Sequence, residues 1–130
     1  MNCASESSDG PKAYDLIERT AKFGESIIRF ARTVPNSAVT VSLIRQLVRS
    51  GTSVGANMCE ANDAVSRKDF RNKIGISKKE AAEVKHWLRM IAVAESDLAE
   101  RSREIWTEAN ELHLILGKSF HTAGKPPATH

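Results

Sequence analysis

Basic residues recur along one flank of a predicted helix between residues 67 and 95, at positions that share one side of that helix. Only small residues separate them, with no acid among them, and we call the cations the basic ridge: Lys68, Arg71, Lys78, Lys85 and Arg89. At 1.5 Å of rise per residue, the ridge is about 30 Å long. Cations in register could contact the phosphates of RNA or DNA without any base-reading group. An ordinary solvated helix face is the alternative, since Lys and Arg are common on helix surfaces.

The other flank of the same predicted helix combines apolar and acidic residues: Ile76, Glu80, Glu83, Trp87 and Met90. Trp and Met are frequent anchors of protein interfaces. Glu80 and Glu83 would be costly inside a monomer core unless paired, and Arg or Lys of a neighbouring chain could supply the pair. This flank therefore favours a subunit interface over a merely wider apolar face. No aromatic residue interleaves with the basic ridge, so base stacking of single strands on the ridge is not expected.

A stripe of polar residues follows one side of the preceding predicted helix: Gln46, Ser50, Ser53, Asn57 and Glu60. Ser and Asn have low helix propensity, so a solvated face would be expected to carry Lys and Glu instead. We interpret this polar stripe as a packing surface that allows close approach and hydrogen bonds across to the Glu80–Trp87 flank or to an adjacent subunit. Gln46 and Glu60 would pair at its ends. Gly51 and Gly55, one turn apart, predict that another backbone approaches this helix closely.

Two patterns could indicate enzymatic chemistry, and both are incomplete. Ser50 and Ser53 have no positioned base nearby and belong to no recognised serine-nucleophile motif. Glu83 and His86 have the Glu-x-x-His spacing of di-iron bundles, but the sequence holds no second copy. We expect His86 to point outward and His113 to be a partly buried, hydrogen-bonded side chain. The sequence therefore predicts no enzymatic activity, no metal, no cofactor and no small-molecule substrate.

Four amphipathic helices are predicted to position these residues. They run from about Pro11 to Val34, from Ala38 or Thr40 to Asp63, from Arg67 to Glu95 and from Leu98 to Phe120. The core-facing positions are Leu16, Thr20, Phe23, Ile27, Phe30, Val34, Ile44, Leu47, Gly51, Val54, Met58, Ala61, Phe70, Ile74, Ser77, Ala81, Val84, Leu88, Ile91, Ile105, Ala109, Leu112 and Leu116. Short breaks make neighbouring helices antiparallel, and Ser66 is expected to cap the backbone N–H of Asp69. The prediction is an all-α, up-down-up-down four-helix bundle over residues 11–121, with disordered tails at 1–10 and 122–130.

Composition bounds the class of the protein. The chain has 130 residues, of which 41% are hydrophobic and 27% charged, with a net charge of +3; this is ordinary for one soluble globular domain. No apolar run approaches the roughly 18 residues of a membrane span, and the N-terminus lacks a signal-peptide pattern. Cys3 and Cys59 lack metal-site spacing and are expected to be free thiols in a reducing compartment. We therefore expect a cytoplasmic protein with no membrane partner.

The polar stripe and the helix after it resemble the four-helix bundle proteins encoded in bacterial 23S rRNA intervening sequences. The resemblance covers about Tyr14 to Phe120 and departs at Met58-Cys59 and Ala61-Asn62. The residues that carry it are Gln46, Leu47, Arg49, Ser50, Ser53, Val54, Asn57, Glu60, Ser66, Phe70, Ser77, Glu80, Glu83, Trp87 and Leu88. It implies a ring-like homopentamer and no established enzymatic activity. The chain is also similar to the accessory protein of diversity-generating retroelements, a basic pentamer that acts with a reverse transcriptase and nucleic acid.

Two functions follow as expectations. The first is a non-enzymatic homo-oligomer, a pentamer by the resemblance, that binds RNA or DNA non-specifically through the basic ridge. The alternative is a protein-interaction scaffold without a nucleic-acid role. Salt-dependent binding to a generic duplex would favour the first, and a stoichiometric protein partner that survives nuclease treatment would favour the second.

Overall fold

The computed structural model describes residues 11–126, with side chains from Asp15 onward. Four helices account for most of this range: α1 (Pro11–Ala31), α2 (Ala38–Asn62), α3 (Arg67–Ala94) and α4 (Ala99–Ala123), with a 3₁₀ turn, η1 (Ser96–Leu98), before α4. No strand occurs in the described residues, so the predicted all-α, four-helix architecture is confirmed. The predicted tail at residues 1–10 and the last four residues of the other tail lie outside the described range.

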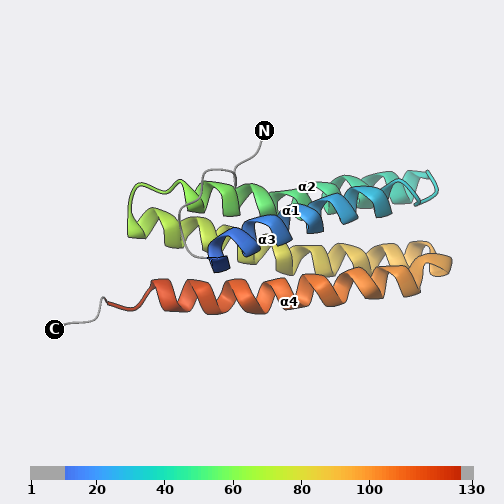
Figure 1. Cartoon of the computed structure of the whole chain (residues 1–130). Helices are drawn as coiled ribbons and strands as arrows, with labels where there is room; N and C mark the ends of the chain where they lie inside the picture. Colours follow the sequence, from blue (N-terminus) through green and yellow to red (C-terminus); the bar gives the residue numbers. More distant parts are fainter. Residues whose placement is uncertain (1–10, 127–130) are drawn as a thin grey trace.

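Consecutive helices run side by side in alternating directions (Figure 1). α3 lies at the centre of this arrangement, because it packs extensively on both α2 and α4. α1 packs mainly on α2 and has few contacts with α4. The basic ridge of α3 therefore lies along the seam between α3 and α4. The bundle is packed less tightly between α1 and α4.

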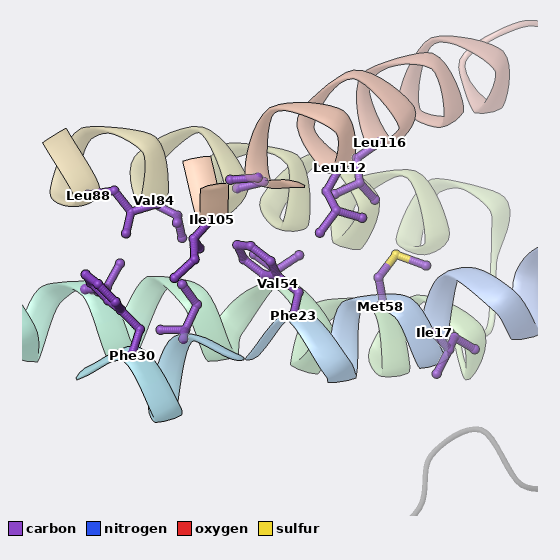
Figure 2. Packing of buried hydrophobic residues seen from close by; sticks show 14 of the residues in the cluster. Ile17, Phe23, Phe30, Val54, Met58, Val84, Leu88, Ile105, Leu112 and Leu116 are labelled. Carbon is purple, nitrogen blue, oxygen red and sulfur yellow. The ribbon is translucent and has the colours of Figure 1, made fainter. Parts of the chain in front are cut away.

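The predicted core-facing positions are buried in nearly every case. Figure 2 shows buried side chains from all four helices meeting in the space between the helices. The buried apolar set includes Phe23, Ile27, Phe30, Leu47, Val54, Met58, Ile74, Val84, Leu88, Ile91, Ile105, Leu112 and Leu116. Three predicted core residues, Leu16, Ile44 and Phe70, are only half-buried, and the neighbouring Ile17 takes the fully buried place on α1. Val34 is buried although it follows the end of α1.

Side-chain caps fix where α2 and α3 begin. Ser37 and Thr40 form a reciprocal capping box, in which the Ser37 hydroxyl accepts from the backbone N–H of Thr40 at 3.1 Å and the Thr40 hydroxyl accepts from Ser37 N–H at 2.9 Å. The predicted cap at Ser66 is confirmed, because its hydroxyl accepts from Asp69 N–H at 3.0 Å. These bonds satisfy backbone donors that a helix start would otherwise leave unpaired.

The two glycines of α2 allow α1 to approach closely, as predicted. A Cβ atom at Gly51 would lie 2.8 Å from two carbon atoms of Ile27, and one at Gly55 would lie 3.2 Å from the backbone oxygen of Thr20. Both distances are shorter than ordinary carbon contacts, so side chains larger than hydrogen would push α1 away. The buried face of α2 is therefore shaped for α1, with Gly51 facing the Ile27 side chain and Gly55 facing the Thr20 backbone.

Two further details differ from the sequence-based expectations. α4 continues through Thr122 and Ala123, past the predicted end of the bundle at residue 121. Cys59 is not a free thiol, because it is disulfide-bonded.

Within the described residues, no helix combines the length and apolar character needed to cross a membrane.

Candidate nucleic-acid interface

Three of the five basic-ridge residues pack against α4, and the other two are exposed. Lys68 and Arg89 are exposed, whereas Arg71, Lys78 and Lys85 are half-buried. The central part of the ridge is therefore partly covered by α4, whereas its two ends are solvated. The stems of its central cations pack against the neighbouring helix, as long basic side chains commonly do on apolar surfaces.

Phe120 of α4 holds the cations at one end of the ridge. The Arg71 guanidinium lies 3.8 Å from the centroid of the Phe120 ring, and its Nε donates to the Phe120 carbonyl oxygen at 3.2 Å. The Lys78 ammonium lies 5.8 Å from the same centroid. These cation–π contacts orient both charges without neutralising them.

Lys85 is held by neutral polar groups of α4. Its Nζ donates to Asn110 Oδ1 at 3.0 Å and lies 3.3 Å from His113 Nδ1. The Trp106 ring centroid is 5.4 Å from the same nitrogen. Burial lowers the pKa of His113, and the positive charges of Lys85 and Lys78 lower it further. His113 is therefore neutral near pH 7 and can accept a hydrogen bond from Lys85, which confirms the expected partly buried, hydrogen-bonded histidine.

The cations of the basic ridge lack carboxylate partners in the described part of the chain. Within residues 15–126, no ridge cation forms an ion pair with a carboxylate. By contrast, Arg19 pairs with Glu108 at 2.7 Å. Arg49 and Lys73 are also paired with acids. Exposed cations elsewhere in the described residues, such as Lys22 and Arg45, are also unpaired, so the ridge is set apart by the alignment of its five cations along one helix flank and not by the lack of pairing alone.

Sequence reasoning missed the aromatic residues beside the ridge, because they belong to another helix. Trp106 and Phe120 of α4 contact Lys85, Lys78 and Arg71. One signal could have found them: Trp106, Asn110, His113 and Phe120 recur at helical spacing on one side of α4. Aromatic groups are thus interleaved with the ridge in space, contrary to the expectation drawn from α3 alone.

The polar stripe of α2 lies beside the Glu80–Trp87 flank of α3, as one of the predicted arrangements requires. Arg49 donates to Glu80 at 3.0 Å and is also paired with Glu83. Glu60 pairs with Lys73 at 2.8 Å. Glu80 and Glu83 therefore find their cation within the same chain, and the expected need for a neighbouring subunit's Arg or Lys is removed.

Most small polar side chains of the stripe bond to their own helix and not across the seam. Ser50 is buried, and its hydroxyl donates to the Gln46 carbonyl oxygen at 2.9 Å. Asn57 Nδ2 donates to the Ser53 carbonyl oxygen at 2.9 Å. A buried bond across the seam comes from α3, where Ser77 Oγ donates to the Val54 carbonyl oxygen at 2.8 Å. At the ends of the stripe, Glu60 is paired across the seam, whereas Gln46 accepts from Arg49 of the same helix at 3.4 Å.

The apolar members of the α3 flank remain partly accessible in a single chain. Ile76 is 41% exposed, while Trp87 and Met90 are half-buried. Trp87 Nε1 donates to Glu83 Oε1 at 3.0 Å, and this bond, with Arg49 adding to it, lowers the pKa of Glu83. The flank therefore presents a surface on which an isoleucine and an indole are partly accessible.

The Glu-x-x-His pattern does not form a metal-binding cluster. Within the described residues, no group of three or more His, Cys, Asp or Glu side chains could hold a metal ion. Glu83 is engaged by Arg49 and Trp87, and His86 is exposed with its ring edge-on to Trp87 at a centroid distance of 4.8 Å. The outward position expected for His86 is confirmed.

The fold and the site together define a four-helix bundle that carries charged and aromatic surfaces along its helix seams. The family profile of the 23S rRNA-intervening sequence protein matches residues 12–118, and the chain belongs to this family. A crystal structure from Bacteroides thetaiotaomicron, described as a protein with unknown function from the S23 ribosomal protein family, superposes with a TM-score of 0.77. It is 31% identical, and the match covers 85% of this chain and 98% of that one. No curated protein matches this chain.

Proposed function

We propose that this protein binds RNA or DNA without sequence preference, through phosphate contacts along the basic ridge, and that it has no enzymatic activity. The observation that carries the proposal is the row of five cations, unpaired in the described part of the chain, along one flank of α3. The ridge cations have no carboxylate partner in residues 15–126, whereas Arg19, Arg49 and Lys73 are neutralised within the fold. Uncompensated cations in register are what a phosphate backbone requires.

The contacts with α4 make the ridge better suited to this role. Aromatic and amide groups hold Arg71, Lys78 and Lys85 in place while leaving their charge intact. Side chains that are already ordered lose less conformational entropy when a ligand binds. Phosphates would therefore meet a preorganised row of charge along the central part of the ridge, about 21 Å of helix.

A charge-removal experiment tests the proposal. Lys78→Gln combined with Lys85→Gln should weaken binding to a 20-base-pair duplex, measured by fluorescence anisotropy at low salt. The matched control is Lys22→Gln with Lys118→Gln, which removes two exposed cations of α1 and α4 that form no ion pair in the described residues. Helix content by circular dichroism should be the same for both variants. Equal affinity of the two variants would contradict the proposal.

We also propose that the protein acts as a ring-like homo-oligomer, with a homopentamer as the expected state. The cytoplasmic location stays a proposal from the sequence alone, because the disulfide at Cys59 removes the free-thiol argument for it. The α2–α3 seam supports an interface, because Ile76 and Trp87 stay accessible beside ordered ion pairs. Light scattering after size exclusion should give a multiple of the 14.3 kDa chain mass. Ile76→Glu should lower that mass, and Val39→Glu, at an exposed apolar position of α2, is the matched control. A 14.3 kDa wild-type species would rule out the assembly.

A further inference from the structure

A separate groove lies where the end of α3 meets η1 and the start of α4. It has a volume of about 380 Å³, which falls in the range of small-ligand sites. Its walls include Arg89 from α3, Arg103 and Trp106 from α4, and two small residues, Ala92 and Ala99. The small residues leave room between the two helices, and the Trp106 side is open because this residue is 39% exposed.

Ser102 gives this groove a polar group without a partner. Ser102 is 2% exposed and also lines the groove. Within the described part of the chain, its Oγ is the one buried side-chain polar atom that makes no hydrogen bond. A buried hydroxyl without a partner is unfavourable, and most such groups in folded proteins are paired with protein or with a bound molecule. A ligand with an acceptor atom in the groove would satisfy it.

The charges of the groove select an anion. Arg89 and Arg103 are both exposed and form no ion pair with any carboxylate in residues 15–126. Lys85 adds a third positive charge 5.4 Å from the Trp106 ring centroid. The indole suits a planar aromatic group, and the two guanidinium groups and the hydroxyl suit a phosphate. The groove therefore matches a planar aromatic ligand that carries a phosphate.

We propose that this groove takes one unstacked nucleotide of a single-stranded nucleic acid. The base packs on the Trp106 indole, the flanking phosphates bind Arg89 and Arg103, and the Ser102 hydroxyl turns to donate to the nucleotide. Because Arg89 also belongs to the basic ridge, this inference rests on the proposed function and adds to it a preference for single strands. A duplex keeps its bases stacked and paired, so it reaches the ridge but not Trp106.

The test compares a labelled ten-residue oligothymidylate with a duplex of the same length, both by fluorescence anisotropy with the full chain. Trp106→Leu keeps apolar volume but removes stacking, and should weaken binding of the single strand about 5- to 100-fold. Duplex affinity should change less than about twofold, because duplex contacts are to phosphate. Trp106→Phe should restore single-strand affinity. Single-strand binding should also quench tryptophan emission in the wild type, and Trp106→Phe should lose that quenching.

Two further variants examine the polar groups. Arg89→Gln with Arg103→Gln should weaken single-strand binding more than Arg32→Gln with Arg45→Gln, a pair of exposed arginines outside the groove. Ser102→Ala should weaken it without lowering stability, because the hydroxyl has no partner in the folded protein. If Ser102→Ala leaves binding unchanged, the hydroxyl has no role in recognition and that part of the proposal fails.

The possible outcomes separate this inference from the proposed function. Equal single-strand affinity of Trp106→Leu and the wild type overturns the nucleotide groove, while duplex binding that needs Lys78 and Lys85 leaves the proposed function standing. A change of oligomeric mass in Trp106→Leu would assign the groove to a subunit contact and also overturn the inference. Absence of binding to both nucleic acids overturns both proposals.

Discussion

The close approach of α1 and α2 makes Gly51→Ala a sharp test of the packing. In an isolated helix, this substitution stabilises by about 1 kcal/mol, because Ala is a far better helix former than Gly. In the bundle, the new methyl group would lie 2.8 Å from both Cγ atoms of Ile27. Carbon atoms in contact normally lie about 3.5–4.0 Å apart. Ile27 is fully buried, and the new methyl group would overlap both of its Cγ atoms. Rotating the Ile27 side chain therefore cannot relieve both overlaps.

The expected result is a net loss of stability. Overpacking of a core typically costs about 1–3 kcal/mol. After subtraction of the helix-propensity gain, Gly51→Ala should lower the free energy of unfolding by up to about 2 kcal/mol. Urea unfolding followed by circular dichroism at fixed protein concentration measures this change.

Gly117→Ala is the matched control for this experiment. Gly117 also lies within a helix, but a Cβ there would meet the flexible end of Lys78 at 3.5 Å, an ordinary contact. This variant should gain about 1 kcal/mol from helix propensity. If Gly51→Ala stabilises the protein as much as Gly117→Ala does, the argument for a glycine-shaped α1–α2 contact is refuted.

Other predictions concern the polar groups of the two seams. The lowered pKa of His113 means that its contribution to stability is present above about pH 6.5 and is lost as pH falls toward the folded-state pKa. His113→Gln should therefore flatten the pH dependence of urea unfolding below about pH 6.5, and an equally steep curve would contradict this. Arg49→Ala should cost roughly 1 kcal/mol or less, because the pair is largely at the surface although the Glu80 side chain is only 15% exposed. A double-mutant cycle with Glu80→Gln should show coupling between the two residues, and zero coupling would contradict the pairing.

The fold could be predicted from the sequence because helical periodicity and side-chain caps are local signals. The apolar positions of α3 and α4 repeat at helical spacing, and Ser66 marks the start of α3 through a bond to a residue three positions away. The glycine pair of α2 also predicted a close contact with another helix, although the sequence could not identify Ile27 as the residue that Gly51 contacts.

The surroundings of the charged residues could not be predicted in the same way, because they depend on how the helices align with one another. Arg49 lies one position before the buried Ser50, and only the α2–α3 alignment places it between Glu80 and Glu83. Likewise, Phe120 is far from Arg71 in the sequence but lies over its guanidinium in the bundle. The sequence showed which residues are charged, whereas the packing of the helices decides which charges remain uncompensated.

The salt dependence of duplex binding tests the central claim most directly. With five ridge cations on phosphates, the logarithm of the association constant should fall against the logarithm of salt concentration with a slope of about −4 to −5 for each bound protomer. Lys78→Gln with Lys85→Gln should reduce the steepness of that slope by about 2, and the Lys22→Gln, Lys118→Gln control should leave it unchanged. A shallow wild-type slope, or the same slope in both double variants, would contradict phosphate binding by the basic ridge.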